Sequence, residues 1–353
     1  MAPYYVYFGF SFFLYLFHLK FKENGKIDDI IFYTLLVFII LFTGLRYQVG
    51  SDWQNYEHEY FLKNKDFISS FTNRDFGFSI LNFTFSSLGF SYVTLNLFLS
   101  IIAVSSVFIF CKNNPNWFIG IFMSIPYFFT MCIMGYVRQG LSIGILFLVF
   151  YAIQNNKKLL FLICIFFAVS IHKSSIIYLP LFALFFINEN FSDIFLSLKK
   201  LFFLFLFVLF VCLFFILLIV LSNQWASIIG YLQQDRHSSG ALVRSIMNLI
   251  PAIIFIIFKN NLNMPNIINK VCYFFTFLSV TFFLIIITKL ISSTFVDRFG
   301  LSLIIFNTII FSRISMLFND STYKFITNIN IILYNFLIMY ILLHYSNNGH
   351  FMY

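Results

Sequence analysis

The chain has 353 residues, of which 61% are hydrophobic and only 10% are charged, and its mean hydropathy is +0.91. A soluble domain of this length carries far more charge on its surface, so the composition excludes a soluble protein and predicts an integral membrane protein. The formal net charge of +9 is explained largely by lysines that keep loops in the cytoplasm. The five cysteines are scattered singly through apolar segments, which indicates small core residues and neither disulfides nor a metal site.

The apolar runs are continuous and lack the alternation of a β-barrel, so they predict helices. About 20 apolar residues are needed to cross roughly 30 Å of hydrocarbon. The first run is expected to be a span, because no basic start or cleavage site marks it as a signal peptide. The sequence predicts an all-α polytopic protein with about twelve transmembrane helices in one membrane domain, 1–353. In chain order the candidate spans are 3–19, 29–45, 91–111, 117–135, 138–154, 159–172, 174–188, 201–222, 242–258, 268–290, 299–312 and 327–344.

The segment 76–90 is apolar, but it contains Ser86, Ser87 and Gly89 and is predicted to be a re-entrant or half-length helix. The outer loops, 46–75 and 223–243, are expected to carry re-entrant or amphipathic helices. Counting 76–90 as a full crossing would separate the first three lysines of one face from the other eight. Without that crossing, the face predicted to be cytoplasmic carries Lys20, Lys22, Lys26, Lys112, Lys157, Lys158, Lys199, Lys200, Lys259, Lys270 and Lys324.

Arginine is concentrated on the opposite face, against the usual topological bias. The guanidinium is a permanently charged fork that matches phosphate or carboxylate in pairs. Such a set favours an extracytoplasmic site for an anion such as a phosphorylated lipid. The alternative is that single arginines at this depth bind ordinary lipid headgroups. The set comprises Arg46, Arg74, Arg138, Arg236, Arg244 and Arg298.

The first polar motif, RYQVGSDWQNY, covers residues 46–56 and follows the second span directly. Polar groups at that depth are costly unless they serve a purpose. Asp52 is placed to begin a short helix with Trp53 and Tyr56 near one face. Asp52 would orient Arg46 or abstract a proton, and the rings would stack on sugars. The alternative is an interfacial aromatic helix with Asp52 as a simple cap.

The second motif, GYVRQG, covers residues 135–140 at the outer start of a span. Glycines at both ends allow a bend or a close approach of the backbone. Arg138 and Gln139 are left at the membrane face between them. A buried arginine at this position requires a partner, which favours a functional role.

The third motif, VSIHKSSIIYLP, covers residues 169–180 between two short apolar segments. His172 is a candidate general base, since imidazole titrates near neutral pH. It is equally suited to donate to a glycan hydroxyl, or to serve as a structural histidine. Weaker signals come later, at Asp235–His237, Arg244 and the adjacent pair Asp297 and Arg298, which need not form a salt bridge with each other.

The sequence contains no GxxxxGK[ST], GxGxxG, HExxH or DxD motif. It therefore offers no argument for nucleotide hydrolysis, dinucleotide binding, zinc proteolysis or a metal-held nucleotide sugar. No metal, cofactor or nucleic-acid partner is expected. Energy for any synthesis would arrive in the substrate.

The three motifs, in this order and spacing across residues 44–180, resemble the EpsG family of Wzy-like polysaccharide polymerases. Trp53 and Ser142 are mild departures from the family pattern. The resemblance implies a GT-C-like glycosyltransferase of the bacterial inner membrane with a site facing the periplasm. Such an enzyme would join undecaprenyl-pyrophosphate-linked repeat units into O-antigen or capsule, among membrane lipids and with a possible chain-length regulator.

For this reaction, the residues expected to bind the pyrophosphate are Arg46, Arg138 and Arg298, and either Asp52 or His172 would activate the acceptor. Tyr56, Gln139, Arg236 and Arg244 would contact substrate. Because one pyrophosphate engages only nearby groups, Arg46, Arg138, His172 and Arg298 are expected to converge in one outer cavity. The alternatives are a flippase for the same lipid-linked oligosaccharide, and an O-antigen ligase or integral acyltransferase.

Overall fold

The computed structural model describes residues 1–62, 75–186, 238, 240–289 and 292–345. The predicted span 201–222, Arg74, Arg236 and most of the loop 223–243 lie outside these residues. The rest of the chain is helical, with no strand among the described residues, which confirms the all-α prediction. Cys111, Cys132, Cys164 and Cys272 are buried and unpaired, as expected of core residues.

Where the connection between two successive helices is itself described, it is short. The N-terminal half forms α1 (Ala2–Phe21), α2 (Gly25–Gly44), α3 (Trp53–Leu62), α5 (Phe76–Ser87), α6 (Tyr92–Lys112), α7 (Trp117–Ser124), the π-helix η1 (Ile125–Ile133), α8 (Val137–Gln154), α9 (Lys158–Ile171), the 3-10 helix η2 (Lys173–Tyr178) and α10 (Pro180–Phe186). The C-terminal half forms α14 (Ala241–Phe258), α15 (Asn266–Thr288), α16 (Ser293–Gly300), η3 (Leu301–Leu303), α17 (Ile304–Ile314), η4 (Ser315–Leu317) and α18 (Ser321–Tyr345).

Seven described helices are long and apolar enough to cross a membrane: α2, α6, α8, α14, α15, the continuous segment Ser293–Leu317, and α18. Four other predicted spans correspond to helices that are shorter or less apolar, namely α1, the pair α7 and η1, α9, and the pair η2 and α10. The chain is thus a polytopic membrane protein. The total of about twelve spans and the GT-C-like architecture stay predictions.

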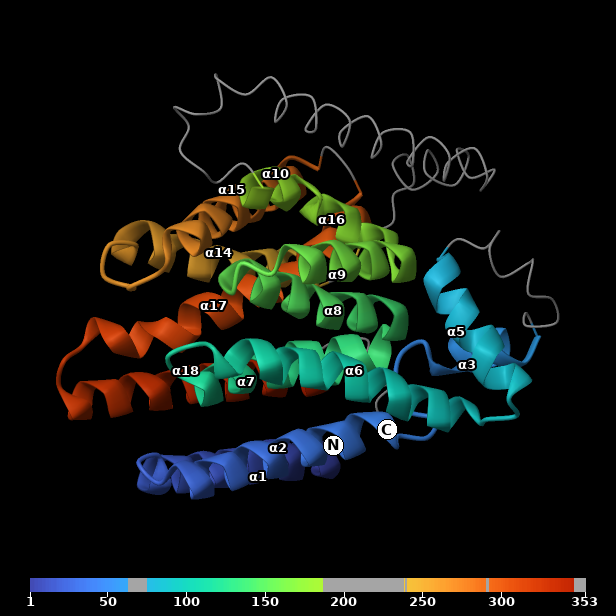
Figure 1. The fold of residues 1–353 in the computed structure, drawn as a ribbon, viewed down its shortest axis with the longest axis horizontal. Coiled ribbons are helices and arrows are strands. Elements are labelled where there is room, and N and C mark those ends of the chain that lie inside the picture. The colour runs from blue at the N-terminus through green and yellow to red at the C-terminus, as the bar shows by residue number, and fades with distance from the viewer. Residues whose placement is uncertain (63–74, 187–237, 239, 290–291, 346–353) are drawn as a thin grey trace.

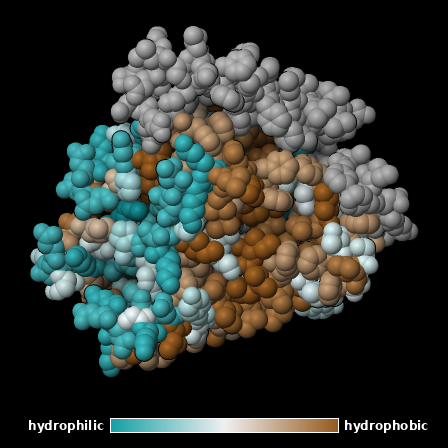
Figure 2. Space-filling view, in the orientation of Figure 1, coloured by the Kyte–Doolittle hydropathy of each residue, from teal (hydrophilic) through white to brown (hydrophobic). Residues whose placement is uncertain are grey.

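The long helices run alongside one another and turn alternately at two ends of the molecule (Figure 1). Hydrophilic residues cover the end at which α1 joins α2, α14 joins α15 and α17 leads into α18 (Figure 2). We call this the lysine end, because Lys20, Lys112, Lys157, Lys259 and Lys324 lie there. The other is the arginine end, where Arg46, Arg138, Arg244 and Arg298 lie. The predicted separation of the two residue types therefore holds for most of the described residues, with Lys173, Lys289 and Arg313 as the exceptions.

The segment 76–90 does not cross the bundle. Its helix, α5, has 12 residues, and both of its flanks lie at the arginine end. Asp75 before it contacts the first turn of α8, and after it the Phe90 carbonyl accepts a hydrogen bond from Tyr60 of α3 at 2.6 Å. The prediction of a half-length helix is confirmed.

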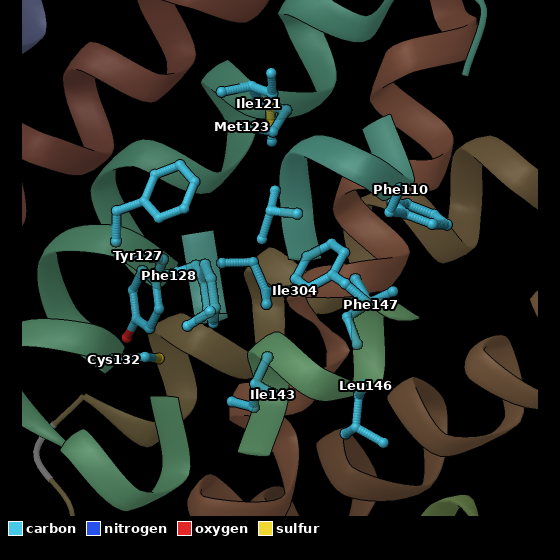
Figure 3. Packing of buried hydrophobic residues seen from close by; sticks show 14 of the residues in the cluster. Phe110, Ile121, Met123, Tyr127, Phe128, Cys132, Ile143, Leu146, Phe147 and Ile304 are labelled. Carbon is cyan, nitrogen blue, oxygen red and sulfur yellow. The ribbon is translucent and has the colours of Figure 1, made fainter. Parts of the chain in front are cut away.

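The core between the two ends is apolar and closely packed, with Phe110, Phe128, Phe147 and Ile304 among its side chains (Figure 3). Residues Ile125–Ile133 form a π-helix in which every residue is buried. Such segments are rare and occur frequently at functional sites. This one leads into the first turn of α8, which carries Arg138.

A close approach between α6 and α8 depends on Gly144. A Cβ atom at this position would lie 2.7 Å from both the Cα and the Cβ of Ala103. By contrast, a Cβ at Gly9 of α1 would meet no atom within 4 Å. Gly144 therefore sets the spacing of these two helices, and Gly9 does not.

We expect Gly144→Ala to lower the free energy of unfolding by about 1–3 kcal/mol, because an added methyl group overpacks a closed contact. Gly9→Ala is the matched control and should be neutral or stabilising by up to about 1 kcal/mol, since alanine is the better helix former. Thermal unfolding of the purified variants in detergent measures both. Equal midpoints for the two variants would contradict the assigned role of Gly144.

Candidate active site at the arginine end

A cavity of about 350 Å³ opens at the arginine end, between the short helices and the first turns of the long ones. It receives residues from all three sequence motifs and from α16. Six residues expected at the site line it together: Asp52, Tyr56, Arg138, Gln139, His172 and Arg298. The other lining residues are Asp75, Tyr136, Lys173, Ser174, Ser238, Thr294, Phe295, Asp297, Phe299 and Leu301.

Arg138, on the first turn of α8, is half-buried and has the partners that a guanidinium withdrawn from water requires. Its Nη1 donates to Asp75 Oδ2 at 3.3 Å and lies 4.0 Å from Glu59 Oε2. The guanidinium carbon lies 5.0 Å from the ring centroid of Tyr56, in cation–π contact. Its charge is therefore held in one place against α3 and α5, with part of the group facing the cavity.

Asp75 also lines the cavity, although no sequence pattern singled it out. It occupies the N-cap position of α5, but its side chain makes no capping hydrogen bond and is turned instead toward Arg138 and His172. Its Oδ1 lies 3.9 Å from His172 Nδ1, within ion-pair distance but beyond a hydrogen bond. Burial opposes ionisation, yet His172, Arg138 and Lys173 together outweigh it and hold the pKa of Asp75 below its ordinary value. The one feature of the sequence that pointed to such a residue is that Arg138, at the start of a membrane helix, requires an acidic partner.

His172 lies between α9 and η2 with an extended backbone, and serine hydroxyls hold the segment that follows it. Ser142 Oγ of α8 donates to the Ala168 carbonyl at 2.6 Å and lies 2.5 Å from Ser175 Oγ. The Tyr178 hydroxyl donates to Ser302 Oγ at 2.7 Å, which ties η2 to η3. The polar residues of the third motif thus place the imidazole beside Asp75.

Asp52 directly precedes α3 and faces the two arginines of the cavity. Burial raises its pKa above the ordinary value, although the positive charges of Arg298 and Arg138 oppose the shift. A carboxylate with a raised pKa is a better proton acceptor than a fully solvated one. Burial likewise raises the pKa of Tyr56, against the charge of Arg138, so its hydroxyl is kept neutral.

Arg46 does not join the cavity, contrary to expectation. Its guanidinium is buried at 7% exposure and donates to the carbonyls of Thr43 and Val49 and, at 3.1 Å, to Asn96 Oδ1 of α6. It also lies 5.6 Å from the Trp53 ring. These contacts use the guanidinium within the protein, so Arg46 holds the loop 46–52 in place rather than facing a ligand.

Arg244 lies behind the cavity wall and does not line it. It forms a bidentate ion pair with Asp297, and its Nη2 donates to Ser238 Oγ at 2.7 Å. Asp297 therefore pairs with Arg244 of α14, and the sequence had not required it to pair with its neighbour Arg298. Gln139 donates to the Arg298 backbone carbonyl. Both interactions fix α16, and with it the Arg298 side chain at the cavity.

The fold and the cavity define a polytopic membrane protein with an anion-compatible site at one end of its helices. The chain matches the model of the EpsG family over residues 29–353 and belongs to that family, which is associated with Wzy-like polymerases and polysaccharide biosynthesis. The match extends past the three motifs into the second half of the chain. No curated protein and no solved structure matches the chain.

The loop 46–52 reaches the cavity through a close contact at Gly50. This residue has φ +125°, and a Cβ atom would lie 2.0 Å from the Met134 carbonyl oxygen. The adjacent Ser51 Oγ donates to the Gly135 carbonyl at 3.4 Å. The loop is thereby seated on the second motif, and this contact places Asp52 opposite Arg138.

We expect Gly50→Ala to be strongly destabilising, because backbone strain of about 1–3 kcal/mol adds to a clash with backbone atoms. Gly89→Ala is the matched control: φ is also positive, +76°, but no atom lies within 4 Å of the added Cβ. The control should cost only about 1–2 kcal/mol of strain. Thermal midpoints and yields of purified protein distinguish the two. A Gly50 variant as stable as the Gly89 variant would remove the argument for how Asp52 is placed.

Proposed function

We propose that this chain is a metal- and nucleotide-independent glycosyltransferase that joins undecaprenyl-pyrophosphate-linked repeat units into O-antigen or capsule. The observation that carries the proposal is the cavity in which Arg138 and Arg298 meet Asp52 and His172. Two guanidinium groups suit a pyrophosphate, and a carboxylate and an imidazole suit proton transfer from a sugar hydroxyl. Membership of the EpsG family supports the same chemistry.

In the proposed reaction, a hydroxyl oxygen of the acceptor repeat attacks the anomeric carbon of the donor glycan. A new glycosidic bond forms, and the bond from that carbon to the lipid pyrophosphate breaks. The leaving pyrophosphate gains negative charge, which preorganised guanidinium groups stabilise where it develops. Charge-assisted hydrogen bonds contribute about 1.5–3 kcal/mol each, so Arg138 and Arg298 together would contribute several.

The acceptor proton requires a base within the cavity, and two candidates lie there. Asp52 is favoured by its pKa, which burial raises, and by its place beside Arg298 and Arg138. His172 lies beside Asp75, which would stabilise an imidazolium if the proton moved to His172 instead. Tyr56 and Tyr136 supply ring surfaces for the sugars.

The lysines at the opposite end support a periplasmic location for this cavity in the bacterial inner membrane, because lysine-rich loops are retained in the cytoplasm. Donor and acceptor would both be lipid-linked oligosaccharides that enter from the bilayer. A chain-length regulator is a further expected partner.

A flippase for the same lipid-linked oligosaccharide needs charged residues along a path between the two faces. Among the described residues, the arginines that line the cavity lie at one end, and the apolar core of Figure 3 lies between the ends. This arrangement favours chemistry on one face over transport. An O-antigen ligase or acyltransferase shares the one-sided arrangement and is separated by its product.

Deletion of the gene tests polymerase against flippase and ligase. Without a polymerase, single repeats still reach the surface, so a gel of surface glycan should show the core-plus-one-repeat band and no longer rungs. Loss of that band, with lipid-linked repeats on the cytoplasmic leaflet, would replace the proposal with transport. Full-length polymer that stays on its lipid carrier would replace it with ligation.

Arg138→Lys should remove most of the polymer although the charge is retained, because an ammonium group cannot form the paired hydrogen bonds of the guanidinium. Arg313 lies in the last turn of α17, near the lysine end, where its Nη1 donates to the Ile309 carbonyl, and it does not line the cavity. Arg313→Lys is therefore the matched control and should leave the ladder intact. The measurement is the glycan ladder at equal membrane levels of each variant. A normal ladder with Arg138→Lys would reduce Arg138 to a structural residue.

A further inference from the structure

A second, larger cavity of about 930 Å³ lies at the lysine end and has no part in the proposed reaction. It lies among the final turns of α1, the link to α2, the start of α7, and η4 with the first turns of α18. Near the arginine end α1 and α18 are in contact, with the Tyr5 hydroxyl 2.8 Å from His344 Nε2. The same two helices both line the cavity at the lysine end.

The inner wall of this cavity is a fixed polar network. His18, which is 9% exposed, has its Nδ1 2.5 Å from Asp28 Oδ1, and the Trp117 indole donates to Asp28 Oδ2 at 3.2 Å. Asn116 donates to Asn328 Oδ1 at 3.3 Å, which joins α7 to α18. The cavity therefore has a defined wall built by four helices, α1, α2, α7 and α18.

Three exposed lysines line the cavity, Lys20, Lys22 and Lys324. The lining contains two acidic residues, and one of them, Asp28, is hydrogen-bonded to His18 and Trp117. The other, Glu23, is a single negative charge beside the three ammonium groups. The balance of charge is positive. An anionic group placed among these lysines would be attracted by all of them.

Apolar side chains accompany these lysines on the outer surface of the helices. Leu16, one turn before Lys20, is 43% exposed, and Phe325, next to Lys324, is 46% exposed. A small soluble anion would gain no binding energy from these apolar side chains. A phospholipid would bind to both kinds of side chain, because its headgroup binds the lysines while its acyl chains pack along the apolar side chains.

We propose that this cavity binds the phosphate headgroup of an anionic phospholipid from the leaflet at the lysine end. The proposal does not depend on the polymerase reaction, since the cavity lies at the opposite end of the helices. The lysines supply the charge, and the His18–Asp28–Trp117 network keeps α1, α2 and α7 at the spacing that leaves room for the headgroup.

The test compares two triple variants of the full-length protein purified in detergent. The cavity variant carries Lys20→Gln, Lys22→Gln and Lys324→Gln. The matched control removes the same charge from the same end at lysines outside the cavity, with Lys157→Gln, Lys158→Gln and Lys259→Gln. Native mass spectrometry measures the binding of phosphatidylglycerol and phosphatidylcholine to each, and thermal midpoints without added lipid show that both are folded.

Wild-type protein and the control should bind phosphatidylglycerol in preference to phosphatidylcholine. The cavity variant should bind phosphatidylglycerol roughly a hundredfold more weakly, as expected from the loss of three lysines near a phosphate. If the triple variant fails to fold, Lys324→Gln alone should weaken binding about fivefold.

Equal weakening in both triple variants would overturn the proposal, because it would show a general effect of charge. Equal binding of the two lipids by the wild type would overturn it as well. Displacement of the lipid by sn-glycerol 3-phosphate at matching concentration would overturn the lipid assignment in favour of a soluble phosphate compound.

Discussion

The guanidinium of Arg138 imposes the constraint on which the rest of the arginine end depends. A permanent charge at the end of a membrane helix is costly unless a carboxylate neutralises it. Asp75 does so, and because it also lies beside His172, one carboxylate joins the starts of α5 and α8 to the end of α9. The half-length helix α5 therefore places an acidic residue at this junction without crossing the membrane.

The four arginines described at the arginine end divide into two pairs with different tasks. Arg138 and Arg298 line the cavity, whereas Arg46 and Arg244 are satisfied by protein groups behind it. The second pair is no less relevant to the site. Arg46 holds the loop that ends at Asp52, and Arg244 holds Asp297, the residue next to Arg298. Arg46 and Arg244 thus act indirectly: the first positions Asp52, and the second positions Arg298.

Helical structure and the gathering of the three motifs were predictable, because hydropathy and the lysine pattern place residues 46–56, 135–140 and 169–180 at one end. The structural role of Arg46 could not be predicted, because its partner Asn96 lies 50 residues away and no sequence pattern links the two residues. Asp75 was missed for the same reason: it is 63 residues from Arg138. The number of spans was hard to predict because α9 and η2, with 14 and 6 residues, are apolar but short.

The buried π-helix Ile125–Ile133 has a consequence for how this architecture tolerates change in length. In a π-helix each N–H donates to the carbonyl five residues back rather than four, so the segment accommodates extra chain within a closed core. Removing one residue there would return the segment toward an ordinary α-helix, and Gly135, on which Ser51 rests, would keep its register because the wider turn had absorbed that residue. The same deletion in a regular α-helix would turn the following backbone by about 100° about the axis, one residue's share of a 3.6-residue turn. The irregular helix is therefore a length adjuster between a rigid core and a site that requires one orientation.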